Sequence, residues 1–199
     1  MSTTRHLRPA GLVIAAALAL AGCSDRAPVA PVAPPPSQLL GLPLLSSSQQ
    51  VSVVTRAVPL ANDISTDAWI GPLGGSLRIP EAGLTVTVPP GAVLSRTYFS
   101  ATALKGNLVA YEFGPHGKTF LVPLIMNQST KGLNVTNSLT NALFPIQAGY
   151  FPSRDGLDLA AGTALVTELL PVKLDLGLGS ATFTVGHFSG YLLASGRAQ

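Results

Sequence analysis

Short segments of alternating apolar and polar residues constrain the fold of this chain more than any other feature. Leu84–Val88 reads Leu-Thr-Val-Thr-Val, the period-two pattern of a half-buried strand. Turn residues such as Gly74-Gly75 separate such segments. After Trp69 the sequence has no stretch of ten or more residues with helical periodicity. The pattern therefore predicts an all-β fold, a single antiparallel β-sandwich over residues 69–199.

Further strands are predicted along the rest of this domain. The candidates are Leu77–Ile79, Tyr98–Leu104, Leu108–Phe113, Phe120–Met126, Ala142–Phe151, Ala164–Leu169, Val172–Leu176, Ala181–Val185 and Phe188–Ala194. Turn residues recur between them, for example at Gly114–Gly117 and Arg154–Gly156. About 130 residues suffice for one such domain with its own hydrophobic core.

The amino-terminal segment has the pattern of a secretory signal peptide. Arg5 and Arg8 precede an apolar run that ends at Leu20, and small residues follow it. The run is about a dozen residues long, whereas a membrane-spanning helix needs about 20. Residues 1–22 are therefore predicted to be a signal peptide. Without it the chain is nearly neutral, and no cluster of Lys and Arg suggests a nucleic-acid partner.

Leu20-Ala21-Gly22-Cys23 resembles the lipobox of bacterial lipoproteins. The resemblance implies a diacylglycerol thioether on Cys23, cleavage before it and acylation of the new amino terminus. Cys23 is the only cysteine of the chain, so an internal disulfide is excluded. Ser24 follows, which by the proteobacterial sorting rule favours the outer membrane. We therefore expect an exported chain that is anchored to the bacterial cell envelope through the lipid on Cys23.

Two segments connect this anchor to the sandwich. Residues 23–37 hold the lipidated cysteine and a linker with five prolines, typical of a semi-rigid polyproline-like spacer. An SH3-type ligand is the alternative interpretation of this linker. Residues 38–68 form a poorly defined connecting segment, in which Val51–Thr55 is a candidate short strand.

Three segments together resemble the ZU-five domain, the β-sandwich of netrin receptors, ankyrins and zonula occludens proteins. They are Ile70–Leu77 with Leu84–Ala92, then Val109–Gly117, then Val185–Tyr191. The resemblance spans roughly residues 69–194. It implies a module for interaction or structural support, since most members of the family use the fold in that way. Fold alone does not establish function.

His187-Phe188-Ser189 matches the tripeptide at which some ZU-five proteins cleave their own backbone. The resemblance implies attack by Ser189 on the carbonyl carbon of Phe188, an ester intermediate, and cleavage between the two residues. Residues i and i+2 of an extended segment share a face, so His187 can activate the Ser189 hydroxyl. Gly186 and Gly190 flank the tripeptide and permit a strained peptide. The alternative is an ordinary last strand with Phe188 in the core.

Other chemistry finds little support in the sequence. The two histidines of the mature chain, His116 and His187, lack the short spacing of zinc ligands, and we expect no metal site and no cofactor. The nucleophile elbow and the phosphate-binding loop are missing, so we expect no enzyme beyond intramolecular autoproteolysis. Aromatic residues form either a recognition patch or part of the core: Trp69, Tyr98, Tyr111, Tyr150 and Tyr191.

Three functions remain open on these grounds. The first is a membrane-anchored envelope lipoprotein that acts as an interaction or structural module with an envelope or surface protein as partner. This function predicts an exposed apolar or aromatic patch. The second is a self-processing domain that cleaves its Phe188–Ser189 bond. The third is a ligand-capturing lipoprotein of a transport system, which predicts a concave apolar pocket with a few polar groups.

Overall fold

The computed structural model describes residues 48–135 and 145–197. The predicted signal peptide, the lipobox with Cys23 and the proline-rich linker therefore lie outside the described residues, as do residues 136–144. Within the described ranges, none of the helices is both long and apolar enough to cross a membrane.

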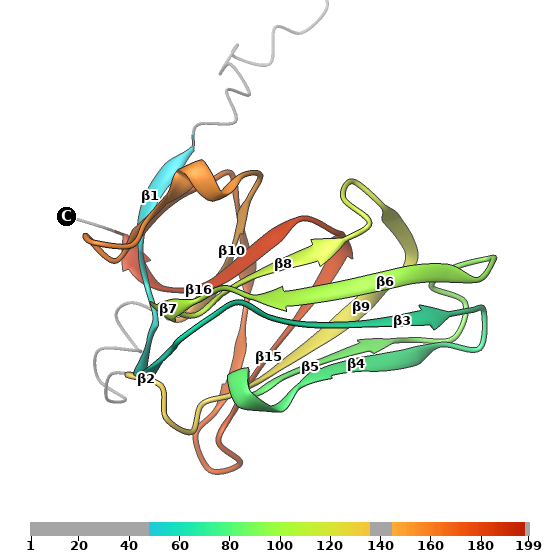
Figure 1. The fold of residues 1–199 in the computed structure, drawn as a ribbon, viewed down its shortest axis with the longest axis horizontal. Coiled ribbons are helices and arrows are strands. Elements are labelled where there is room, and N and C mark those ends of the chain that lie inside the picture. The colour runs from blue at the N-terminus through green and yellow to red at the C-terminus, as the bar shows by residue number, and fades with distance from the viewer. Residues whose placement is uncertain (1–47, 136–144, 198–199) are drawn as a thin grey trace, which may run out of the picture. The chain divides into compact units, whose positions relative to one another are not determined.

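The described residues form sixteen strands and two short 3-10 helices, η1 (Pro80–Ala82) and η2 (Arg154–Gly156) (Figure 1). The first eight strands are β1 (Gln49–Val53), β2 (Thr55–Leu60), β3 (Ile64–Ile70), β4 (Gly75–Ile79), β5 (Leu84–Val88), β6 (Thr97–Ala103), β7 (Gly106–Leu108) and β8 (Ala110–Gly114). The others are β9 (Thr119–Ser129), β10 (Gln147–Phe151), β11 (Leu157–Asp158), β12 (Thr163–Val166), β13 (Glu168–Pro171), β14 (Lys173–Asp175), β15 (Ser180–His187) and β16 (Gly190–Arg197).

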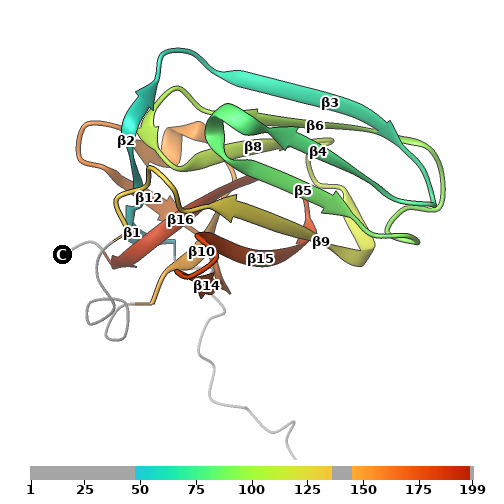
Figure 2. The ribbon, with the colours of Figure 1, turned by 90° about the horizontal axis from the view of Figure 1, so that it is seen from below.

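Antiparallel pairing arranges these strands in two main sheets. The larger sheet has the order β11-β12-β1-β16-β8-β6-β3, and β10 and β13 join it through β16. The smaller sheet has the order β14-β15-β9-β5-β4, and β2 pairs separately with β7. Figures 1 and 2 show β3, β6 and β8 in one layer and β4, β5, β9 and β15 in the other. The predicted all-β antiparallel sandwich is confirmed.

Strand β16 is buried on both faces, and this explains its apolar sequence. Tyr191 and Leu193 belong to the main core between the sheets, whereas Leu192 and Ala194 belong to a second cluster on the opposite face. Successive side chains of a strand point to opposite sides, so the alternation places each residue in one of the two clusters. The second cluster also contains Phe151, which is 1% exposed.

The sheets begin before the boundary expected at residue 69. β1 overlaps the candidate strand Val51–Thr55, β3 begins within the connecting segment 38–68, and both pair with strands of the larger sheet. β3 pairs with β6 over its full length, from Ile64 opposite Ala103 to Ile70 opposite Thr97. Val51 and Val53 of β1 are 1% and 5% exposed and belong to the second cluster. The sandwich therefore includes residues from 49 onward.

Two connections cross from one sheet to the other beside each other. The loop at residues 115–118 links β8 of the larger sheet to β9 of the smaller one, and Phe188–Ser189 links β15 to β16 in the reverse direction. β16 pairs with β8 in one sheet and β15 pairs with β9 in the other. The paired strands hold the two crossings together, and this places the predicted cleavage tripeptide against the loop at 115–118.

Candidate functional sites

The predicted cleavage tripeptide is divided between a strand end and a sheet crossing. His187 ends β15, and Phe188 and Ser189 form the link to β16. Phe188 is fully buried, and its ring lies 4.9–5.6 Å, centroid to centroid, from three other rings: Phe99, Phe113 and Phe120. The side chain of Phe188 is therefore a central part of the main core. Ser189 is 7% exposed, a rare buried polar residue of this domain.

His187 is directed away from Ser189. Its Nε2 atom lies 3.2 Å from a carboxylate oxygen of Glu168, and its Nδ1 atom lies 3.2 Å from the hydroxyl oxygen of Tyr191. The Tyr191 hydroxyl also donates a hydrogen bond to the backbone carbonyl of His187 at 2.9 Å. The extended geometry that would place His187 and Ser189 on one face is interrupted at the crossing. The expected His187–Ser189 pair is therefore not formed.

A different histidine lies beside Ser189. His116, in the loop between β8 and β9, places its Nδ1 atom 3.4 Å from the Ser189 hydroxyl oxygen. The Gly117 N–H donates to the Phe188 carbonyl at 2.8 Å, and the Phe188 N–H donates to the Lys118 carbonyl at 2.9 Å. The carbonyl of the Phe188–Ser189 peptide is thus held by a backbone donor, with an imidazole at the serine. Base, nucleophile and carbonyl donor are the parts that an acyl shift needs.

The glycines that flank the tripeptide do not adopt a left-handed backbone. Neither Gly186 nor Gly190 is among the glycines with positive φ. A Cβ on Gly190 would lie 2.4 Å from the nearest atom of the Phe151 ring, whereas a Cβ on Gly186 would meet no atom within 4 Å. Close packing against Phe151 therefore explains why position 190 is a glycine. The conformation of the two glycines does not support the backbone strain that the sequence predicted.

One end of the sandwich exposes several large apolar side chains. Leu73 lies between β3 and β4, Leu94 lies between β5 and β6, and Leu121 lies at the start of β9. Their exposed fractions are 91%, 82% and 68%. Backbone hydrogen bonds join the three segments, from Gly91 N–H to the Pro72 carbonyl and from Leu121 N–H to the Ala92 carbonyl. The two loops that carry Leu73 and Leu94 are therefore joined to each other and to the start of β9, which carries Leu121.

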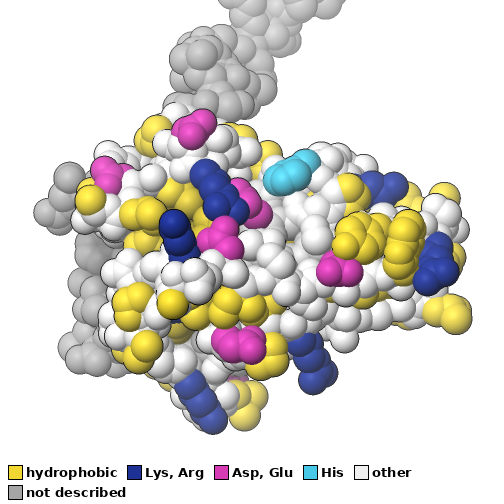
Figure 3. Space-filling model, viewed as in Figure 1, with side chains coloured by type: hydrophobic (Ala, Val, Ile, Leu, Met, Phe, Trp, Pro, Cys, Tyr) yellow, Lys and Arg dark blue, Asp and Glu magenta, His cyan; other side chains and the backbone are white. Residues whose placement is uncertain are grey.

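An aromatic pair lies beside these leucines. Trp69 of β3 and Tyr98 of β6 are direct cross-strand partners, with ring centroids 5.3 Å apart. They are 58% and 45% exposed. The guanidinium carbon of Arg96 lies 5.4 Å from the centroid of the Trp69 ring, within cation–π range. Figure 3 shows apolar side chains gathered at this end of the domain beside basic ones.

We call the exposed set Trp69, Leu73, Leu94, Tyr98 and Leu121 the apolar end. Large apolar side chains exposed together at one end of a domain are typical of interaction sites. Tyr111 and Tyr191, in contrast, are 2% and 0% exposed and belong to the main core. The aromatic residues are thus divided between the two roles that the sequence left open.

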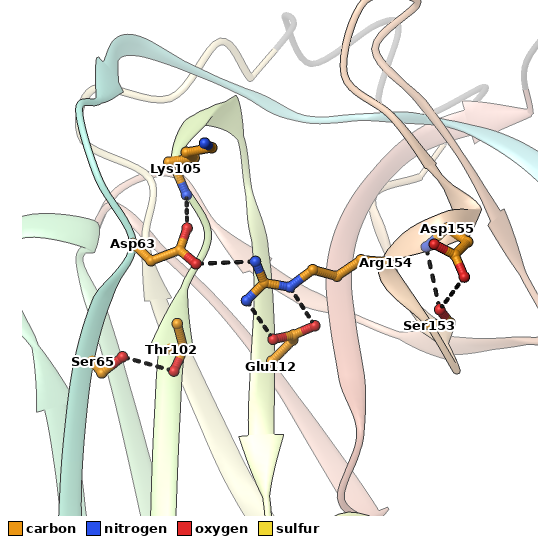
Figure 4. Close-up of polar contacts among 8 residues, drawn as sticks. All are labelled: Asp63, Ser65, Thr102, Lys105, Glu112, Ser153, Arg154 and Asp155. Atoms are coloured by element: carbon orange, nitrogen blue, oxygen red, sulfur yellow. Dashed lines mark hydrogen bonds and ion pairs between the residues drawn. The ribbon is translucent and has the colours of Figure 1, made fainter.

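A charged cluster lies on the larger sheet. Arg154 of η2 forms two hydrogen bonds with the Glu112 carboxylate, at 2.7 and 2.6 Å, and a third with Asp63 at 3.0 Å (Figure 4). Asp63 also accepts from the backbone N–H of Lys105 at 2.8 Å, and this contact, more than Arg154, lowers its pKa. The cluster fastens the segment around η2 to the sheet, and it is fully paired.

The described residues include no group of three or more His, Cys, Asp or Glu side chains placed to hold a metal ion. The larger of two surface cavities, about 460 Å³, lies beside β11 and β12 and has a rim that includes Gln50, Asp155 and Asp158. The smaller, about 330 Å³, adjoins the buried side chain of Arg56.

The fold and these sites define an antiparallel β-sandwich with an exposed apolar end. No model of a known protein family matches this chain, and no curated protein matches it.

The sequence interpretation missed three of the residues that matter here: His116, Leu73 and Leu94. His116 was assigned to a turn, because its position gave no sign that Ser189 would be its neighbour. Leu73 and Leu94 are leucines in Gly/Pro-rich turns, and this is itself a signal: a large apolar residue at the tip of a turn has no core to enter.

Proposed function

We propose that this chain is a lipid-anchored bacterial envelope protein whose ZU-five-like β-sandwich binds a protein partner through the apolar end. The observation that carries the proposal is the exposure of three leucines and an aromatic pair on adjoining loops and strand ends. Burying such surface against a partner contributes about 25 cal/mol per Å² of apolar area. Aromatic and Arg side chains are the usual anchors of interfaces, and Arg96 lies over Trp69.

The lipid on Cys23 locates this interaction at the membrane. The lipobox-like sequence and the proline-rich linker lie on the amino-terminal side of the domain, so the tether allows the domain to reach a neighbour in the envelope. Incorporation of labelled palmitate into the parent chain, and its loss in Cys23→Ser, tests the anchor. An unlabelled parent chain would remove the anchor from the proposal and leave the binding surface to be tested separately.

A photo-crosslinking amino acid at position 73 or 94 tests the surface in intact cells. We expect a discrete protein adduct from both positions, and we expect it to disappear when Trp69→Ala and Leu121→Glu are added. Position 178 is the matched control, because Leu178 is 79% exposed but lies near Ser180, which pairs with Ser129 at the far end of β9. No adduct at 73 and 94, or an equal adduct at 178, would refute the proposal, and a lipid adduct would replace the protein partner with the bilayer.

Self-cleavage is a second candidate, favoured by the contacts of His116 and Gly117. In this reaction the Ser189 hydroxyl oxygen attacks the Phe188 carbonyl carbon while His116 Nδ1 accepts its proton. The Gly117 N–H stabilises the negative charge that develops on the carbonyl oxygen. The carbon–nitrogen bond then breaks, and the proton passes to the departing amine of Ser189. Water hydrolyses the resulting ester to a Phe188 carboxylate and regenerates the Ser189 hydroxyl.

The denatured mass of the mature chain, made without lipid, tests this reaction. Denaturant is needed because residues after the cut would stay paired in β16 with β8 and β10. Cleavage predicts loss of residues 189–199 in the parent chain, and an intact chain in Ser189→Ala and in His116→Ala. His187→Ala should still be cleaved, since His187 contacts Glu168 and Tyr191 instead. An intact parent after long incubation would exclude self-cleavage and leave the interaction module.

A further inference from the structure

Arg56 of β2 carries a buried positive charge at the edge of the main core. Its side chain is 6% exposed, and its guanidinium carbon lies 5.5 Å from the centroid of the Tyr111 ring. One nitrogen, Nη1, donates to the Leu108 carbonyl. The other two, Nε and Nη2, are buried and have no hydrogen-bond partner among the described residues. Buried polar atoms without partners are rare in folded proteins, and each one calls for an explanation.

The neighbouring polar groups are hydrogen-bonded to one another, and none of them pairs with Nε or Nη2 of Arg56. The Tyr111 hydroxyl is hydrogen-bonded to Gln128 Oε1 and lies 3.1 Å from the Ala82 carbonyl oxygen. The Gln128 amide nitrogen donates to the carbonyls of Ala82 and Ser129, both at 2.9 Å. Within the described ranges, one edge of the guanidinium is therefore left without a hydrogen-bond partner.

No carboxylate neutralises this charge in the described part of the chain. The ion pairs found there involve Arg154 and His187, not Arg56. Glu81 lies at the cavity rim, but it is exposed and forms no ion pair with Arg56. A buried charge without a counter-ion is strongly unfavourable, so an external anion would relieve it.

The cavity of about 330 Å³ adjoins Arg56. This volume lies within the range of small-molecule sites. Its walls combine apolar surface with a second cation, Lys131. The lining residues are Arg56, Val58, Pro80, Glu81, Ala82, Gly83, Ser129, Lys131, Gly132 and Leu133. Nε and Nη2 are themselves covered, so a ligand in the cavity reaches them only after the side chains that cover them move.

We propose that this cavity binds a small organic carboxylate. The Nε and Nη2 atoms form one edge of the planar guanidinium, whose two parallel N–H groups match the two oxygens of a carboxylate. Lys131 adds a second positive charge at the rim, and Val58 and Leu133 offer apolar contact for the rest of the ligand. The site is independent of the apolar end and of the lipid anchor. Its test therefore does not depend on the proposed function.

The test uses the full chain in a non-ionic detergent, with butyrate and benzoate as probes at neutral pH. We expect each carboxylate to shift the nitrogen–proton signal of the Arg56 Nε–H in a nuclear magnetic resonance spectrum. At about a hundredfold excess over the dissociation constant, the melting temperature should rise by about 5–10 °C. Butyramide and benzamide have the same shapes without the charge, and they should produce neither effect.

Variants test whether the response to carboxylates depends on Arg56 and on the cavity. Arg56→Met should abolish it, and Arg56→Lys should weaken binding at least tenfold because an ammonium lacks the two-pronged edge. Val58→Trp fills the cavity mouth and leaves Arg56 in place, so it tests the site even if the arginine variants unfold. Arg78→Met, at an exposed arginine of β4 outside the cavity, is the control and should bind as the parent does.

Several results would overturn the proposal. They are a parent chain whose Arg56 signal does not move with either carboxylate, a response that survives in Val58→Trp and Arg56→Met, and equal binding of the neutral amides. A larger response to inorganic phosphate than to either carboxylate would overturn the carboxylate assignment in favour of a phosphate site.

Discussion

Substitution of Gly190 separates a packing role for this glycine from a strain role. Gly190 opens β16, is buried, and faces the Phe151 ring directly. A Cβ at this position would lie 2.4, 2.6 and 2.6 Å from three ring carbons of Phe151. These separations are far inside van der Waals contact, so the ring must move. Phe151 is 1% exposed within the second cluster, where little free space is available for the movement.

We expect Gly190→Ala to lower the free energy of unfolding by about 1–3 kcal/mol, the usual cost of overpacking a core. Gly186→Ala is the matched control in the strand on the other side of the crossing. Its added Cβ meets no atom within 4 Å, and its backbone is not left-handed. Alanine there should be neutral or should stabilise by up to about 1 kcal/mol, because it restricts the unfolded chain.

Urea denaturation followed by circular dichroism measures both variants, and a double variant identifies the clash. Phe151→Leu shortens the side chain over Gly190, so Gly190→Ala should cost clearly less in that background than in the parent chain. Equal stability of the two single alanine variants, or a Gly190→Ala cost that is unchanged with Leu at 151, would refute the packing explanation.

Three further predictions concern the core and the ionisable groups. Phe188→Ala should cost about 3–5 kcal/mol in chemical denaturation, because its ring is fully buried among three others, and a loss below about 1 kcal/mol would contradict this placement. Arg154→Gln should cost no more than about 1 kcal/mol, since its ion pairs are partly exposed, and the cost should shrink in high salt. Burial raises the pKa of Tyr111 and Tyr191 above the ordinary value of 10. The stabilisation that results is present below pH 10 and is lost as the pH rises through the raised pKa values of the folded chain. An absorbance titration should therefore show two of the four tyrosines ionising only as the chain unfolds, and four simple titrations in the folded chain would contradict this.

The strands with strong local patterns could be predicted from the sequence. Leu84–Val88 was predicted with the bounds of β5, and the predicted Ala181–Val185 lies inside β15. Both strands alternate between buried and more exposed residues, and glycine or proline lies close to their ends. Where one face of a strand is buried and the other is more exposed, apolar and polar residues alternate in the sequence, and the strand can be predicted from this pattern.

The strands β2 and β3 lacked such a pattern. β3 is an edge strand that pairs with β6 alone, and all its residues except Ile70 are exposed or only partly buried. Its alternate positions hold Thr66 and Ala68 as well as isoleucine, so the inward face is only weakly apolar. β2 contains Pro59 and buries Arg56, both contrary to the usual composition of a strand. Pairing with later strands, not local preference, determines these elements.

The contact between His116 and Ser189 depends on pairing in both sheets at once. β8 and β16 are neighbours in the larger sheet, where Glu112 pairs with Gly190. β9 and β15 are neighbours in the smaller sheet, where Thr119 pairs with His187. The two connections between the sheets must then run side by side, and the residues in their middles, His116 and Ser189, have to meet. A search confined to neighbours in sequence finds His187, whose side chain is directed to Glu168 instead. Any chemistry at Ser189 therefore draws on the β8–β9 loop, and a sequence can reveal such a partner only through knowledge of which strands pair.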